Sequence, residues 1–137
     1  MKRVSRGGII GSAVMRMCGA DVDIADVDLL CGEEDAARLL DSLGLPRAPG
    51  QPDTRFRSRL FGRWTDAPLT VEIMTGFHVR ESGKWHPVRP LSRQARMYGG
   101  VRTFTPEVSE LLHLCRRFDR PKDRANARKL LSLGALP

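Results

Sequence analysis

Two aspartates in the segment IADVDLLC, residues 24–31, have a spacing that could bind a metal ion. Asp26 and Asp28 lie one residue apart and lead into an apolar run, which predicts a strand over 24–31. Because alternate residues of a strand point to the same face, the two carboxylates would converge on one spot. Hard divalent cations relieve the repulsion between neighbouring carboxylates. A magnesium site is therefore one interpretation, and surface acids paired with arginines are the other.

A third carboxylate, Glu72, is the one acid in the segment LTVEIMTGF, residues 69–77. The apolar alternation of this segment predicts a strand that forms a hairpin with a strand within residues 54–62. A half-buried glutamate in a sheet is unusual without a partner. Its partner could be a metal ion shared with the aspartates, or an arginine from residues 55–63 across the hairpin.

Gly11 and Ser12 follow a short, glycine-broken strand predicted over residues 4–10 and open a helix predicted over 12–18. A glycine and a serine at a helix start leave backbone N–H groups and a hydroxyl free to hold an anion. The more common meaning of such a serine is an ordinary N-cap.

The remaining pattern predicts a helix with acids in its first turn over 32–44, a loop over 45–53, an irregular or weakly stranded region over 78–105, and helices over 106–118 and 121–134. The order of elements predicts an α/β (α+β) fold with a single mixed β-sheet flanked by helices. A length of 137 residues with 41% hydrophobic content predicts one domain over residues 1–137.

Composition excludes several classes of protein. No apolar run approaches the length of a membrane span, and the basic N-terminus is a poor signal peptide, so we expect a cytoplasmic protein without membrane contact. Three widely spaced cysteines without a CxxC pair argue against a disulfide framework or a zinc cluster.

The formal charge of +7 is unevenly distributed. Residues 1–50 carry 6 Lys/Arg against 8 Asp/Glu, a net of −2, whereas residues 51–137 carry 17 against 8, a net of +9. An acidic pole beside a basic pole suits a ligand that combines cations with phosphates, such as a metal-bound nucleoside triphosphate. The alternative is an arginine-rich, solvated surface.

The Gly-Ser helix start, the Asp-x-Asp strand and the later acid together resemble the nucleotidyltransferase superfamily related to DNA polymerase β. The segments GSAVMRMCGADVDIADVDLL, VEIMTGF and RPKDRANARKLL resemble blocks of small bacterial members of that superfamily, around the AbiEii toxin group and the aminoglycoside and lincosamide adenylyltransferases. The resemblance implies a minimal nucleotidyltransferase fold with C-terminal helices, and it implies the following roles. Asp26, Asp28 and Glu72 would bind Mg²⁺ (or Mn²⁺) and form the catalytic set, Gly11 and Ser12 would hold triphosphate oxygens, and Arg120 and Lys122 would face the phosphates with Asp123 orienting them.

The activity implied by this resemblance is transfer of a nucleoside monophosphate from a nucleoside triphosphate, such as ATP, to a hydroxyl acceptor. An alternative is a non-catalytic module on the same fold that binds tRNA, another nucleic acid or a partner protein. A toxin–antitoxin component is a third interpretation, and a homodimer is consistent with each of them.

Overall fold

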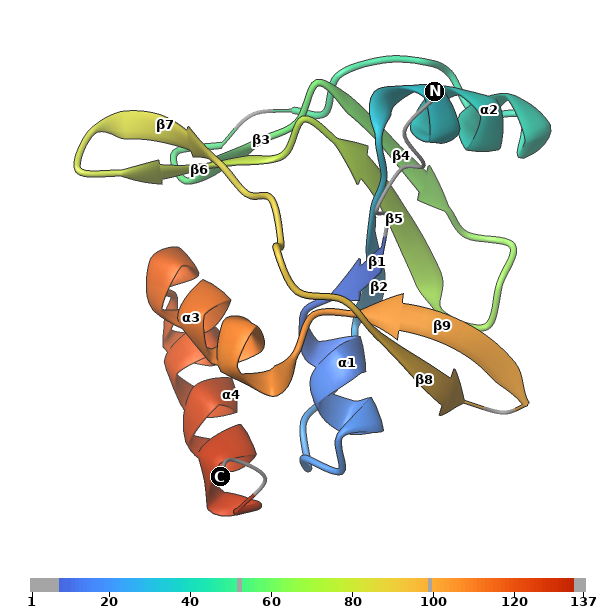
Figure 1. The fold of residues 1–137 in the computed structure, drawn as a ribbon. Helices are drawn as coiled ribbons and strands as arrows, with labels where there is room; N and C mark the ends of the chain where they lie inside the picture. Colours follow the sequence, from blue (N-terminus) through green and yellow to red (C-terminus); the bar gives the residue numbers. More distant parts are fainter. Residues whose placement is uncertain (1–7, 52, 99, 135–137) are drawn as a thin grey trace.

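The computed structural model of the chain describes residues 8–51, 53–98 and 100–134 (Figure 1). Four helices are present in this part of the chain: α1 (Ser12–Met17), α2 (Glu33–Ser42), α3 (Val108–Phe118) and α4 (Pro121–Ser132). The strands there are β1 (Gly8–Ile10), β2 (Asp26–Leu30), β3 (Phe56–Arg57), β4 (Leu60–Trp64), β5 (Thr70–Thr75), β6 (His78–Glu81), β7 (Lys84–Pro87), β8 (Gln94–Tyr98) and β9 (Val101–Thr105). The expected α+β class, with a mixed sheet flanked by helices, is confirmed, but the described residues form three sheets and not the single sheet expected. Residues 4–7 of the expected first strand lie outside the described residues.

The main sheet has the strand order β1-β2-β5-β4. β2 and β5 run parallel, and β1 and β4 pair antiparallel with their neighbours at the two sides. The parallel register places Asp28 opposite Glu72 and Leu30 opposite Met74. Since side chains alternate along a strand, these four residues share one face of the sheet.

Helix α2 covers the opposite face of the main sheet. Ala36 and Leu40 of the helix pack with Ile73 of β5, and all three side chains are buried. The acids Glu33, Glu34 and Asp35 in the first turn of α2 favour its N-terminus electrostatically. The helix predicted over residues 32–44 is confirmed by this element.

The face that carries Asp28 and Glu72 is divided into two parts. Toward the carboxyl ends of the strands, Leu30 and Met74 are buried against Leu114 and Phe118 of helix α3. Toward their amino ends the same face carries carboxylates. Helix α3 therefore packs on the apolar half of this face, whereas the other half carries Asp28 and Glu72.

Helices α1, α3 and α4 form a second apolar cluster beside the sheet. Val14 of α1, Leu111 of α3 and Leu130 of α4 are each at most 1% exposed and pack in one cluster. Helix α4 begins at Pro121, as expected, because proline lacks the N–H that would be unsatisfied at that position. This cluster holds the second half of α4 against α1 and α3.

Residues 78–105, expected to be irregular or weakly stranded, form regular strands. β6 and β7 join β3 in a three-stranded sheet, and β8 pairs with β9 in a separate hairpin. Ser82 and Gly83 both have positive φ, 51° and 76°, and make the two-residue turn between β6 and β7. Paired positive φ angles match the right-handed twist of a hairpin, and Ser-Gly is a signal for such a turn.

The strand expected within residues 54–62 is divided between two sheets. β4 pairs with β5 as predicted, but β3 leaves the main sheet and pairs with β6. The division allows Phe56 to stack on Phe77 and to meet the edge of Phe118, with ring centroids 5.5 and 5.2 Å apart. Aromatic packing therefore competes successfully with continuous pairing to β5.

Gly62 of β4 is expected to be required for the contact between α2 and the main sheet. A Cβ at this position would lie 2.3 Å from Leu40 Cδ2, and Leu40 is fully buried. We predict that Gly62→Ala lowers the free energy of unfolding by about 1–3 kcal/mol, measured by urea denaturation. The double variant Gly62→Ala/Leu40→Ala should lose less stability than the sum of the two single variants, because the added methyl fills the space of the deleted side chain. Strict additivity would contradict the packing argument.

Candidate carboxylate site

Asp28 and Glu72 face each other across the parallel pair of β2 and β5. They are direct partners in the register, and the two carboxyl groups are hydrogen-bonded to one another. Such a bond requires one of the two groups to carry a proton. Burial, followed by this bond and the charges of Glu72 and Asp26, raises the pKa of Asp28 from 3.8 to about 7. A shared proton therefore holds two acids together that would otherwise repel each other.

Asp26 lies one row further along the same face and interacts electrostatically with Asp28. Its carboxylate is paired with Arg63 of β4, whose Nη2 is 3.7 Å from Asp26 Oδ1. The same guanidinium reaches Glu72, with Nε 3.7 Å from Oε2. The arginine partner that was one alternative for Glu72 is thus present, on the same face as the other two carboxylates.

Gly11 brings the backbone against Asp28. A Cβ at Gly11 would lie 2.8 Å from Asp28 Oδ2, and the residue has φ +82°, a conformation that favours glycine. The interpretation of Ser12 as the N-cap is wrong: Gly11 occupies that position, no side chain caps the helix, and Ser12 is its first residue. Gly11 therefore lies directly beside Asp28, at the start of α1.

The two cations at the start of α4 differ in their surroundings. Lys122 is exposed, and its ammonium is close enough to Asp28 to lower the pKa of that carboxyl. Arg120 is held by Asp123, with Nε 2.6 Å from Oδ2 and Nη2 3.0 Å from Oδ1. The Arg120 guanidinium also lies 4.8 Å from the centroid of Phe56. The expected ion pair with Asp123 is present, and the Arg120 guanidinium lies against the aromatic cluster that contains Phe56.

The donor set is suited to a hard cation, although it is not closed around one. Within residues 8–51, 53–98 and 100–134, no three His, Cys, Asp or Glu side chains lie close enough together to enclose a metal ion. Two carboxylates are in contact, the third is adjacent, and carboxylate oxygens are the ligands that Mg²⁺ and Mn²⁺ prefer. A divalent ion here would take the place of the Asp28 proton and of the Arg63 guanidinium. The residues thus fit the ion by the chemistry of their oxygens, although the three carboxylates are not arranged around one.

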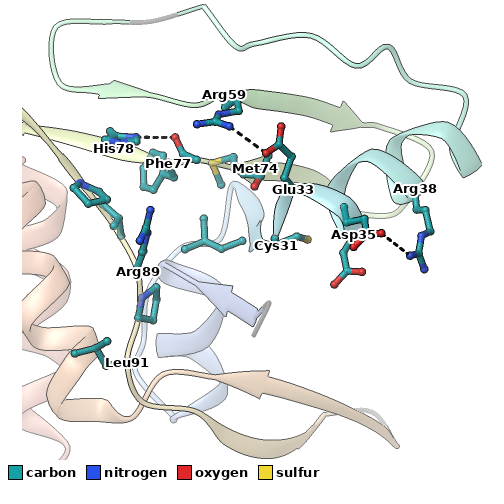
Figure 2. Close-up of a pocket in the computed structure, with 18 residues that line it drawn as sticks. Cys31, Glu33, Asp35, Arg38, Arg59, Met74, Phe77, His78, Arg89 and Leu91 are labelled. Carbon is teal, nitrogen blue, oxygen red and sulfur yellow. Dashed lines mark hydrogen bonds and ion pairs between the residues drawn. The ribbon is translucent and has the colours of Figure 1, made fainter. Parts of the chain in front are cut away.

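A separate cleft of about 1090 Å³ opens at the carboxyl ends of β2 and β5, and it contains none of the three carboxylates (Figure 2). Its lining combines Glu33, paired with Arg59 at 3.1 Å, with Arg89 on the segment after β7. Burial and the charge of Asp35 raise the pKa of the Cys31 thiol to about 11, so this thiol is protonated at neutral pH. We therefore place the candidate site at the carboxylates, where charged groups converge, and not at the larger cavity.

Arg63 is the site residue whose role the sequence did not assign. Its contact with Glu72 could have been predicted from the hairpin of β4 and β5, because the register places Arg63 directly opposite Glu72. The additional contact with Asp26 could not be derived from the hairpin, since it depends on the pairing of β5 with β2.

The Asp28 carboxyl predicts a particular dependence of stability on pH. Because its pKa rises from its ordinary value of 3.8 to about 7 in the folded protein, its stabilising contribution is present below about pH 4 and is lost as the pH rises through about 7. In chelator, Asp28→Asn should therefore be more stable than the parent protein at about pH 8, by a few kcal/mol at most, with a smaller difference at about pH 5. Urea denaturation at both pH values measures this. The matched variant Asp23→Asn, in the exposed loop before β2, should show no such change, and parallel pH profiles for parent and Asp28→Asn would contradict the shared proton.

None of the helices in the described residues combines the length and the apolar composition that a membrane span requires. No family model matches the sequence, and no curated protein matches it either. Among solved structures, the chain is similar to the crystal structure of a "putative nucleotidyltransferase" from Thermotoga maritima. The TM-score is 0.69 at 19% sequence identity, and the match covers 96% of this chain and 84% of that chain. The likeness shows that the two proteins share a fold, which is consistent with the nucleotidyltransferase fold expected from the motifs.

Proposed function

We propose that this protein is a nucleotidyltransferase that transfers a nucleoside monophosphate from a nucleoside triphosphate to a hydroxyl acceptor. The observation that carries the proposal is the convergence of Asp26, Asp28 and Glu72 on one sheet face, with Gly11 against Asp28. The fold shared with the Thermotoga maritima protein supports it.

Asp26, Asp28 and Glu72 would hold Mg²⁺ (or Mn²⁺), which when bound supplies positive charge to the triphosphate and to the departing pyrophosphate. Gly11 and Ser12 would hold triphosphate oxygens, and Gly11 lets the start of α1 approach Asp28, because a Cβ there would meet Oδ2. Ser12 adds a hydroxyl at the start of α1. Lys122 is exposed and close to Asp28, so its ammonium can pair with a phosphate oxygen.

The reaction would proceed by attack of the acceptor oxygen on the α-phosphorus. The new bond joins that oxygen to phosphorus, the bond from the α-phosphorus to the bridging oxygen breaks, and pyrophosphate leaves. The proton of the acceptor hydroxyl would pass to a carboxylate of the site, for which Glu72 is a candidate. Asp123 and Arg120 would act at a distance by fixing the first turn of α4, from which Lys122 projects.

Binding of nucleoside triphosphates tests the proposal directly. Isothermal titration with ATP, CTP, GTP and UTP should show binding of at least one of them in Mg²⁺ and a loss of roughly tenfold or more in Asp26→Asn/Asp28→Asn. The loss is expected because two of the anionic oxygen ligands are removed. Unchanged binding in the double variant would eliminate the metal site. The same variant with an intact urea transition serves as the control for folding.

Lys122 can be separated from the rest of α4 by the same titration. Lys122→Ala should weaken triphosphate binding about tenfold, on the order of 1.4 kcal/mol, and leave nucleoside binding nearly unchanged. Lys129→Ala, an equal loss of charge on the last turn of α4, is the matched control and should have little effect. Equal losses for triphosphate and nucleoside would assign Lys122 to the fold instead.

Arg63 should compete with the metal ion. Its guanidinium already neutralises Asp26 and Glu72, with 55% of its side chain exposed and free to move away. We predict that Arg63→Gln tightens Mn²⁺ binding roughly fivefold in the absence of nucleotide, corresponding to about 1 kcal/mol for one partly exposed charge. Paramagnetic resonance of free Mn²⁺ measures this without any need for turnover.

Two further variants control the Arg63 experiment. Arg63→Lys keeps the charge and should bind Mn²⁺ as the parent does, whereas Arg59→Gln removes an arginine paired with Glu33 outside the site and should have no effect. Weaker Mn²⁺ binding in Arg63→Gln would show that this arginine positions the carboxylates for the ion and does not compete with it.

A further inference from the structure

The three-stranded sheet of β3, β6 and β7 has a basic, aromatic outer face. Its register places Arg57, His78 and Pro87 in one row. Arg80 and Trp85 are paired two residues further along β6 and β7, so they project from the same face. In Figure 1 the β6–β7 hairpin projects sideways from the rest of the molecule. The outer face is therefore a distinct surface, away from the carboxylates.

The two arginines of this face are gathered on one indole ring. The Arg57 guanidinium lies 4.7 Å from the centroid of Trp85, and that of Arg80 lies 5.9 Å away. Both arginines are exposed, and Trp85 is partly exposed. Arginine stacks on an aromatic face while its N–H donors remain available at the edge of the plane. The cluster thus holds two cations beside a planar ring.

In the part of the chain that the structure describes, no carboxylate forms an ion pair with Arg57 or Arg80. Glu81 is the one acid in β3, β6 and β7, and its side chain projects from the other, inner face of this sheet. There it forms an ion pair with Arg117, whose Nη2 lies 2.8 Å from Glu81 Oε1. That inner face is buried against α3 through Val79, which is fully buried, and Phe56, whose ring meets Phe118. Burial of the inner face fixes which side chains point outward, so the arginines and the tryptophan are held together by the fold.

The outer face continues into the cleft at the ends of β2 and β5. His78 and Pro87 belong to both, and Arg89, two residues beyond Pro87, also lines the cleft (Figure 2). Arg89 thus lies at the rim of the cleft next to the outer face, and the other side of the cleft carries the acids Glu33, Glu34 and Asp35 of α2. An extended anionic chain could contact both Arg57 and Arg80 on the outer face, whereas a small ion would use only one of these cations.

We infer that this outer face binds single-stranded nucleic acid. Its arginines would contact phosphates, and Trp85 would stack with a base or hold an arginine against one. A single strand is favoured over a duplex because a ring can stack only on a base that is unpaired and accessible. The inference does not depend on the proposed nucleotidyl transfer, because it involves none of the carboxylates and needs neither nucleotide nor metal.

Fluorescence anisotropy of a labelled oligouridylate of about 12 nucleotides, in chelator, tests the inference. The parent protein should bind at low salt, and affinity should fall steeply as salt rises. Arg57→Gln/Arg80→Gln should weaken binding about tenfold and reduce the slope of log affinity against log salt by about 1.4, the value for two lost phosphate contacts on a single strand. Arg128→Gln/Lys129→Gln on the exposed side of α4 makes the same change in charge and should leave the slope unchanged. Equal effects of the two double variants would overturn the inference, because they would indicate attraction by net charge alone.

The tryptophan provides a second measurement. In a Trp64→Phe background, the oligouridylate should quench the fluorescence of the remaining indole, Trp85. Trp85→Leu should bind the oligouridylate roughly fivefold or more weakly, and Trp85→Phe should lose less affinity. Urea transitions of the variants separate these effects from unfolding. Absence of quenching would overturn the inference. Displacement of the oligouridylate by polyglutamate at equal charge concentration would also overturn it, and would assign the face to an acidic polypeptide.

Discussion

The contact between Asp28 and Glu72 is the constraint around which the candidate site is arranged. Two carboxyl groups on neighbouring strands repel each other when both are ionised, so they stay together only by sharing a proton or a cation. The parallel pairing of β2 and β5 imposes this proximity, because the register aligns the two residues directly. The fold supplies cationic groups on two sides: Arg63 from β4 and Lys122 from α4.

The same sheet face shows how the fold tolerates this contact. Two residues beyond the acids, Leu30 and Met74 are buried against α3 and anchor the strands. Apolar burial on one half of the face can thus hold the strands in a register that is unfavourable on the other half. A site of this kind lowers the stability of the empty protein, and a ligand that binds the acids restores it.

The sequence predicts the elements of the site better than its contacts. Period-two alternation was sufficient to place the aspartates and Glu72 on strands, because that pattern is local. The separation of Gly11 from Asp28 depends on tertiary packing, as does the direction taken by Arg120, whose guanidinium contacts Asp123 and the ring of Phe56. The strands of residues 78–105 were missed for another reason: their signal was the Ser-Gly turn at 82–83, and few apolar residues alternate beside it.

The basic excess of residues 51–137 is divided by the fold into two environments with different consequences. Arg63 and Lys122 lie beside acids, so their charge is balanced within the carboxylate site. Arg57 and Arg80 lie beside a tryptophan, which attracts a cation but leaves its charge uncompensated. Cations of the first kind would adjust the affinity of the proposed metal or phosphate site, whereas those of the second kind raise the potential of an open surface. A net charge of +9 over this part of the sequence therefore describes two separate features, and only the fold distinguishes them.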